Sequence, residues 1–377
     1  MAGPLEGLRI IELAGIGPSP YACMLLADLG ADILRLERGD VDAAPTMTGD
    51  LLARSRPSVA IDLKVDAGRS LVLELSERAD VLIEAFRPGV AERLGLGPDD
   101  VRARNPRLVY ARMTGYGQDG PLSQRAGHDI NYIAVSGALW PLGRYGERPL
   151  PPTNFVGDFG GGSLFLALGV LSAVLWARSS GEGQVVDVAM VDGSASMMTM
   201  MHSFINSGYW HEARGTNILD TGAHFYEVYE TSDGGFMAVG AIEAKFYRAL
   251  LVGLGLADEE LPAQMDRESW PMMKERFSKV LLSKTRDQWT VIFDDLDACV
   301  TPVLSPSEAV EHPYNARRHV FTREPVVQPM PAPRFSKTPG EIRSEPRAPG
   351  SGTRDGLRAW GISEERIIAL GRDGAFG

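Results

Sequence analysis

Short apolar segments alternate with helical patterns through the first third of this 377-residue chain. Strands are predicted at residues 8–14, 31–36, 58–63, 80–84 and 108–113, and helices at residues 20–30 and 68–79. Apolar strands joined by helices are typical of a parallel sheet that is covered on both faces. The pattern therefore predicts an α/β fold with a doubly wound parallel sheet. Such sheets bind ligands beyond the carboxyl ends of their strands.

The pattern changes after Ser207. Two apolar segments, 225–230 and 236–241, flank a Ser-Asp-Gly-Gly turn, and helical patterns follow at 244–254, 270–282 and 286–293. Seven prolines then lie between Pro325 and Pro349, which favours an extended surface segment, and a last helix is predicted at 363–370 with Ser363 as its cap. We expect three parts: a large α/β domain (1–207) that ends in a linker helix, a smaller α+β domain (225–321), and a return segment (322–377) that completes the large domain.

Composition excludes several classes of protein. The chain has 49 acidic and 38 basic residues and a net charge of −11, which argues against nucleic acid as the main ligand. Two cysteines rule out a disulfide framework, and the six histidines form no i, i+4 pair, so we expect no metal site. The first residues do not resemble a secretion signal, nor the last ones a peroxisomal tag, so a cytoplasmic location is expected.

One uncharged stretch, residues 160–177, is almost long enough to span a membrane. It is rich in glycine, alanine and serine and is flanked by Asp158 and Arg178. We interpret it as a helix of the protein core whose small residues let other elements approach closely, and we expect no membrane partner.

The turn at Gly15–Pro20 imitates a dinucleotide-binding fingerprint, with Glu37 about twenty residues later. Pro20 replaces the third glycine, which close helix–strand packing requires. Pro18 and Pro20 also remove two N–H groups that would face a pyrophosphate. A plain strand-to-helix turn is the simpler interpretation. Arg38, at the end of a strand, is suited to a phosphate.

Three polar residues follow predicted strands or begin predicted helices. His128, in a Gly-His-Asp-Ile-Asn-Tyr segment, is either a hydrogen-bonded structural histidine or a proton-transfer group. Asp158, before Gly160–Gly162, is either the N-cap of the apolar helix or a functional carboxylate at a terminus whose N–H groups receive an oxyanion. Glu243 is either an ordinary helix cap or functional. Five methionines between Met190 and Met201 suit either a core or an adaptable apolar surface.

These residues carry a resemblance. Asp28–Asp32, Glu84–Gly89, Thr114–Gln118 and Gly181–Asp187 are similar to signatures of the family III CoA-transferase superfamily. Gly127–Tyr132 is specific for its α-methylacyl-CoA racemases, because the transferases tend to carry a bulky aromatic residue at the position of His128. The sequence therefore resembles these racemases over almost its whole length.

The resemblance implies the site. It implies catalytic roles for His128 with Glu243, and for Asp158, and an acyl-CoA substrate with no cofactor. It also implies an interlocked homodimer in which Glu243 reaches the site from the small domain of the second chain. One departure, His224 where relatives usually carry proline, leaves the local loop shape and the acyl preference open. The implied CoA contacts are Arg38, Ile61, Asp62, Leu63, Lys64, Ala85, Phe86, Arg87, Arg93, Gly127, Asp129, Ile130, Asn131 and Tyr132.

The chemistry agrees with this interpretation. Racemisation of a 2-methylacyl-CoA needs a base on each face of the α-carbon and donors for the enolate oxygen, each donor contributing about 3–4 kcal/mol. Alternatives from other classes are a family III CoA transferase with Asp158 as nucleophile, a non-catalytic acyl-CoA- or nucleotide-binding protein, and an NAD-dependent dehydrogenase. The transferase needs neither His128 nor Glu243, and the dehydrogenase needs the missing glycine.

Overall fold

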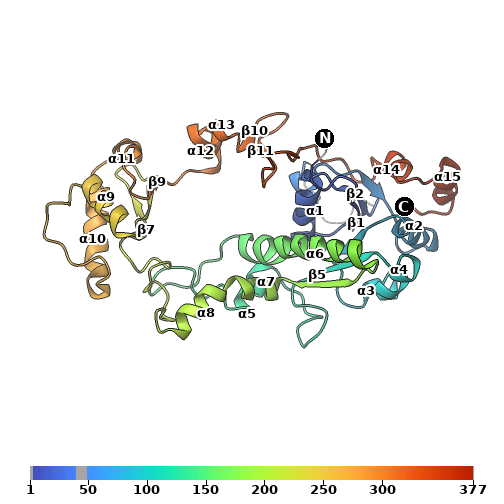
Figure 1. Ribbon diagram of the computed structural model, residues 1–377, viewed down its shortest axis with the longest axis horizontal. Coiled ribbons are helices and arrows are strands. Elements are labelled where there is room, and N and C mark those ends of the chain that lie inside the picture. The colour runs from blue at the N-terminus through green and yellow to red at the C-terminus, as the bar shows by residue number, and fades with distance from the viewer. Residues whose placement is uncertain (1–2, 40–48, 377) are drawn as a thin grey trace. The chain divides into compact units, whose positions relative to one another are not determined.

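The computed structural model describes residues 3–39 and 49–376, which form two compact units. The first unit takes the described parts of residues 1–136, 153–197 and 321–377, and the second takes residues 137–152 and 198–320. Two segments that we expected in the large domain, 137–152 and 198–207, therefore belong to the second unit. Figure 1 follows the elements along the chain.

A six-stranded parallel sheet organises the first unit, in the order β3-β2-β1-β4-β5-β6. The five strands predicted from the sequence are present, and the sixth, β6, was not predicted. The strands are β1 (Arg9–Leu13), β2 (Asp32–Glu37), β3 (Ser58–Ala60), β4 (Val81–Glu84), β5 (Val109–Thr114) and β6 (Val185–Ala189). The order reverses between β1 and β4, so this point is the topological switch point of a doubly wound sheet.

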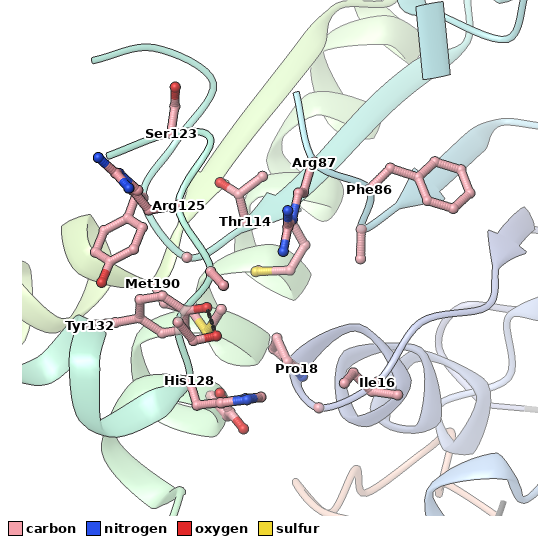
Figure 2. Close-up of a pocket in the computed structure, with 18 of the residues that line it drawn as sticks. Ile16, Pro18, Phe86, Arg87, Thr114, Ser123, Arg125, His128, Tyr132 and Met190 are labelled. Atoms are coloured by element: carbon pink, nitrogen blue, oxygen red, sulfur yellow. Dashed lines mark hydrogen bonds between the residues drawn. The ribbon is translucent and has the colours of Figure 1, made fainter. Parts of the chain in front are cut away.

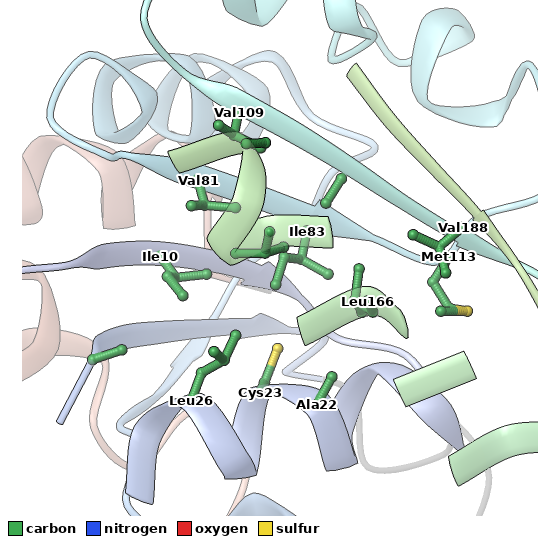
Figure 3. Packing of buried hydrophobic residues seen from close by; sticks show 14 of the residues in the cluster. Ile10, Ala22, Cys23, Leu26, Val81, Ile83, Val109, Met113, Leu166 and Val188 are labelled. Atoms are coloured by element: carbon green, nitrogen blue, oxygen red, sulfur yellow. The ribbon is translucent and has the colours of Figure 1, made fainter. Parts of the chain in front are cut away.

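Two hydrophobic cores cover the two faces of the sheet, because successive side chains of a strand point to opposite faces. Ile10 belongs to one core and Ile11 to the other, and both are fully buried. The first core packs α1 (Pro18–Asp28) and α6 (Phe165–Ser180) on the sheet; Figure 3 shows Ile10, Cys23 and Leu166 within it. The second core uses α2 (Asp66–Ser76), α4 (Pro98–Arg104), α14 (Thr353–Ala359) and α15 (Glu364–Arg372). The predicted α/β fold is confirmed.

The long apolar helix begins earlier than expected. A π-helical segment, η2 (Phe155–Leu164), runs directly into α6, which in turn packs along β5. Asp158 lies inside this π-helical segment, so the prediction that it is a helix N-cap was wrong. The combined helix Phe155–Ser180 is long and apolar enough to cross a membrane, and 39% of its most apolar window is buried within the structure.

Two arginines, buried Arg54 and exposed Arg343, tie the proline-rich segment to the rest of the first unit. The Arg54 guanidinium binds the Asp28 carboxylate at 2.5 Å and donates to the side chain of Gln328. Arg343 donates to the Ala27 carbonyl at 3.0 Å. The predicted last helix is confirmed, since Ser363 Oγ accepts the Arg366 N–H at the start of α15. Short elements complete the unit: η1 (Leu51–Ala53), α3 (Val90–Arg93), α5 (Asp129–Val135), α7 (Met190–Met197), β10 (Phe321–Thr322) and β11 (Gln328–Pro329).

The second unit is built on an antiparallel sheet of β7 (Tyr226–Glu230), β8 (Phe236–Gly240) and β9 (Val300–Pro302). The predicted hairpin and the three predicted helices are confirmed as β7–β8 and as α9 (Ala244–Leu254), α10 (Trp270–Leu281) and α11 (Arg286–Asp294). The remaining helices are α8 (Thr199–Asn206), η3 (Arg267–Ser269), α12 (Pro306–Glu311) and α13 (Pro313–Arg318).

His224, the departure from the family pattern, lies in the core of the second unit and is 1% exposed. Its ring packs edge-on against Phe225, Tyr247 and Phe277 at 5.0–5.5 Å between centroids. The imidazole therefore helps to fill the core of the unit that contains it.

Candidate active site

A cavity of about 510 Å³ opens in the first unit at the switch point of the sheet. Its walls are the turns that follow β1, β4 and β5, together with the start of α5 and part of η2. Figure 2 shows Ile16 and Pro18 on one side, Arg87 and Thr114 across from them, and His128 near Tyr132. The cavity therefore lies where a doubly wound sheet is expected to bind its ligand.

The wall after β4 is held by a buried ion-pair network. Glu84 is fully buried, and its carboxylate accepts the Phe86 N–H at 2.6 Å and the Arg112 Nε–H at 2.8 Å. Arg112 also pairs with Glu92 at 2.7 Å. Burial raises the pKa of Glu84, while the Phe86 N–H and Arg112 oppose this shift. This network fixes the turn that presents Ala85, Phe86 and Arg87 to the cavity.

The position of the Tyr132 ring explains why two loop positions are glycine. A Cβ at Gly115 would lie 2.0 Å from Tyr132 Cε1, and one at Gly127 would lie 2.8 Å from the same atom. The Tyr132 hydroxyl donates to the Gly127 carbonyl, and its ring meets Tyr116 edge-on at 4.9 Å. Burial raises the pKa of Tyr132 to about 12, so its hydroxyl keeps its proton at neutral pH. Tyr132 thereby fixes the loop that carries His128.

His128 is the N-cap residue of α5 and has an exposed side chain that lines the cavity. Its backbone N–H donates to Asn131 Oδ1 at 3.1 Å, which fixes the main chain at the start of the helix. The imidazole is thus presented to the cavity on an anchored backbone.

Asp158 is half-buried and lines the same cavity. Burial raises the pKa of its carboxyl; the Asn154 amide, which donates to Asp158 Oδ2 at 3.2 Å, lowers it, nearby Asp129 raises it, and His128 lowers it. The predicted acid and base groups, His128 and Asp158, therefore share one cavity rather than two.

The glycines after Asp158 serve a close approach between two helices. A Cβ at Gly161 would lie 2.7 Å from the Ser194 backbone nitrogen and 3.0 Å from the Met190 carbonyl oxygen. The neighbour that we expected at this turn is thus the backbone of α7. The Asp158 N–H donates to Asp129 Oδ2, so this donor is not free for an oxyanion.

Seven of the residues proposed from the sequence line the cavity: His128, Asp158, Ala85, Phe86, Arg87, Gly127 and Tyr132. Arg38 and the segment Ile61–Lys64 follow β2 and β3, at the same edge of the sheet but outside the cavity lining. Arg93 ends α3, and exposed Ile130 and Asn131 lie in the first turn of α5. Asp129 is buried beneath the Asp158 backbone. Their CoA contacts stay predictions.

Glu243 belongs to the second unit, where it is the exposed N-cap residue of α9. Its side chain makes no capping hydrogen bond, and its carbonyl accepts the Tyr247 N–H at 2.9 Å. Glu243 thus occupies the helix-cap position that the sequence predicts, and it caps through its backbone rather than its side chain. Its pairing with His128 stays a prediction.

Sequence reasoning missed several cavity residues. Ile16, Met113, Ser123 and Arg125 line the cavity but belong to no motif that we singled out as a site. Arg125 stands close before the Gly-His-Asp segment, which was the one available signal. Met190, from the methionine cluster, also lines the cavity and is 6% exposed.

Glu37, the acidic residue of the dinucleotide-like pattern, is bound by its own neighbours. Glu37, which would bind the ribose, instead accepts from Arg35 Nε at 3.3 Å and from the Ser58 hydroxyl. Within residues 3–39 and 49–376, no group of three or more His, Cys, Asp or Glu side chains is arranged to hold a metal ion.

Comparison with known proteins identifies the family of this chain. Residues 5–354 match the family model described as CoA-transferase family III. The chain belongs to this family.

Two racemases are similar to this family III chain over nearly its full length. Alpha-methylacyl-CoA racemase from Mus musculus is 47% identical over 374 residues, covering 98% of this chain and 96% of that protein. The racemase of the same name from Homo sapiens is 44% identical and covers 98% of this chain and 96% of its own. A solved CAIB/BAIF family protein from Brucella suis shares the fold, with a TM-score of 0.81, 23% identity, and 95% and 99% of the two chains covered.

Proposed function

We propose that this family III chain racemises 2-methylacyl-CoA thioesters, and is thus an isomerase that transfers a proton at a single carbon. The observation that carries the proposal is that His128 and Asp158 line one cavity at the switch point of the sheet. The identity of 47% and 44% to two alpha-methylacyl-CoA racemases supports it.

The proposed reaction has two proton transfers. One base removes the C2 proton of the thioester, the electron pair moves into the carbonyl to form an enolate, and the second group returns a proton to the opposite face of C2. The C2–H bond that breaks and the one that forms balance, so no redox partner is needed. Asp158 suits this work because burial raises the pKa of its carboxyl and so eases its change between the neutral and charged forms.

We assign the second proton transfer to the imidazole of His128, because histidine is the side chain best suited to moving a proton at neutral pH. We also propose that Glu243, from the small domain of a second chain, orients this imidazole. Support for this role is that Glu243 is exposed and makes no capping hydrogen bond, so its carboxylate is available within its own unit.

We propose that the CoA moiety binds along the edge of the sheet where the carboxyl ends of the strands lie. Arg38 after β2 and Lys64 after β3 are exposed cations at the same edge as the cavity, and suit phosphate groups. Arg87 would hold the part of CoA that enters the cavity. Arg93 and the residues Gly127, Ile130, Asn131 and Tyr132 would complete the contact.

The alternative, a CoA transferase with Asp158 as nucleophile, is not favoured. Such an enzyme has no use for an imidazole beside the nucleophile, whereas His128 lines the cavity with Asp158. The racemase needs both groups.

We further propose that the chain acts as a homodimer. Four apolar side chains, Leu164, Leu168, Leu175 and Trp176, form a stripe along η2 and α6 and are 51–69% exposed. Their spacing places them on one side of the helix, a pattern typical of a surface that another chain covers. Light scattering should give twice the chain mass, and the double variant Leu168→Glu/Leu175→Glu should give the chain mass. A wild-type monomer would contradict this proposal.

A cytoplasmic location and the absence of nucleic acid, membrane and cofactor partners stay predictions from the sequence, and a role in lipid metabolism is part of this proposal. Because the stripe along η2 and α6 is apolar and exposed, liposome flotation is the control for the membrane prediction. We expect the protein not to bind the liposomes.

The function is tested with each pure enantiomer of a 2-methylacyl-CoA in deuterated water. Proton NMR should show loss of the C2 signal, and chiral analysis should show both samples converging on an equal mixture. A protein that binds the thioester but places no deuterium at C2 would contradict the proposal.

A further inference from the structure

Asp129 is a buried carboxylate that does not line the cavity. It is 6% exposed, and its Oδ2 accepts the backbone N–H of Asp158 at 2.6 Å. Its other oxygen, Oδ1, is buried and has no hydrogen-bond partner among the described residues. A buried carboxylate with one unpartnered oxygen is costly, so a role in function is worth testing.

The packing around this contact leaves little freedom. A Cβ at Gly157 would lie 2.4 Å from Asp129 Oδ2, so only glycine lets the chain approach the carboxylate. The Asp158 carbonyl accepts from Ser163 Oγ at 2.9 Å, and its carboxylate accepts from Asn154 Nδ2 at 3.2 Å. Asp158 is therefore held at its N–H, its carbonyl and its side chain by three different residues.

We propose that Asp129 is a positioning residue, which fixes the π-helical turn at Asp158 and holds a buried carboxylate close to the reacting carboxyl. This inference rests on the proposed function and deepens it, since it gives Asp129 a role toward the reacting group in place of a direct contact with CoA.

The charges around Asp158 are consistent with this role. Burial is the main reason that the pKa of Asp158 is raised; Asn154 opposes the shift, Asp129 adds to it, and His128 opposes it. Tyr132 is the other titratable group of α5 that faces the carboxyl. Gly17, the uncharged residue before α1, faces the Asp158 carboxylate, and Asp192 of α7 lies toward Asp187. Asp129 is thus the anion that adds to the raised pKa of the Asp158 carboxyl.

Two substitutions separate the charge from the contact. Asp129→Asn removes the charge but keeps an oxygen that can accept the Asp158 N–H, whereas Asp129→Ala removes both. The pH profile of kcat/KM for C2 proton exchange should show its acid limb moved to lower pH by roughly half a unit to one unit in both variants. kcat at pH 8 should fall at least about tenfold further in Asp129→Ala than in Asp129→Asn, because only the latter holds the turn.

The KM for the acyl-CoA distinguishes this role from a direct CoA contact. Positioning predicts a KM within about twofold of wild type in both variants, because the Asp129 side chain does not line the cavity. A raised KM with unchanged kcat and an unmoved acid limb would overturn the proposal.

Asn154→Ala serves as the opposite control. It removes the amide that lowers the pKa of Asp158, so its acid limb should move to higher pH. Equal activity and identical pH profiles for Asp129→Asn, Asp129→Ala and wild type would overturn the proposal, as would loss of the fold in both Asp129 variants, which would make the residue purely structural. If the wild-type protein exchanges no C2 proton, the proposed function itself fails, and this outcome is recognised before any variant is made.

Discussion

Gly193 of α7 lies so close to Gly161 of the π-helical segment that a Cβ at position 193 would sit 1.9 Å from the Gly161 carbonyl oxygen. The neighbouring atoms are backbone, so they cannot move aside as a flexible side chain would. This contact sets the path of the segment that carries Asp158.

Gly193→Ala should therefore destabilise the protein by about 3 kcal/mol or more, at the upper end of the cost of overpacking. Urea unfolding measures this. Gly371→Ala is the matched control, because Gly371 also lies in a helix, α15, but its Cβ would meet Phe376 at an ordinary 3.6 Å. The control should gain roughly 0.5–1 kcal/mol from the better helix propensity of alanine. Equal effects of the two substitutions would show that the close approach does not constrain the turn.

The buried ion pair behind the cavity should contribute far more to stability than an exposed one. Arg112→Met leaves the buried carboxylate of Glu84 without its cation, so we expect a loss of about 3–5 kcal/mol. Arg104→Met, which removes an exposed pair with Glu77, should cost less than about 1 kcal/mol. Urea unfolding of the two variants compares them directly. Similar losses would contradict the role assigned to the Glu84 network.

Arg125 should contribute to substrate binding. Arg87 and Arg125 line the cavity, and neither forms an ion pair within the described part of the chain, so both are available to an anionic substrate. Arg125→Ala should raise the KM for an acyl-CoA about fivefold or more, weaken its dependence on salt, and leave kcat within about twofold. Arg107→Ala, a change outside the cavity, is the control. An unchanged KM for Arg125→Ala would remove this residue from the binding site.

His224 should make the stability of the protein depend on pH. Burial, with a smaller contribution from Lys274, lowers the pKa of His224 to about 4 from its usual 6.5, and its Nε2 lies 2.8 Å from the Tyr247 hydroxyl oxygen. As the pH falls, His224 takes up a proton in the unfolded chain before it does so in the folded protein. Its contribution to stability is therefore fully present above pH 6.5 and is lost as the pH falls toward 4. Between pH 7 and pH 5 the loss should be about 2 kcal/mol.

Urea unfolding at the two pH values checks this prediction. His224→Gln should be less stable at pH 7, because its amide replaces a well-packed ring, but it should lack this part of the pH dependence. The same dependence in wild type and variant would assign it to other groups.

Sequence reasoning found the sheet because its strands are buried on both faces. Ile10 and Ile11 are adjacent and both apolar, a pattern typical of a strand that is covered on both faces. The sixth strand was missed because Val185 is 40% exposed and Asp187 interrupts the apolar pattern, so β6 at the edge of the sheet lacks this signal.

Part of the candidate site could also be predicted from local sequence patterns. His128 stands in a loop after a predicted strand, and Asp158 stands before a run of glycines at the start of a predicted helix; both signals can be read in a sequence. The π-helical turn at Asp158 is not, because it depends on the packing of α7 against Gly161 and on the Asp129 contact. Arg125 was missed because its place in the cavity comes from the path of a long loop.

The measurement that tests the central claim most directly is the inversion of each enantiomer of a 2-methylacyl-CoA by wild type, His128→Ala and Asp158→Asn, followed by chiral chromatography. Assays for transfer of CoA to free acids run beside it. The two-base account predicts inversion by wild type, and a loss of about a thousandfold or more in each variant with no transfer by any of the three proteins. Inversion by His128→Ala at the wild-type rate, or CoA transfer that depends on Asp158 alone, would contradict it.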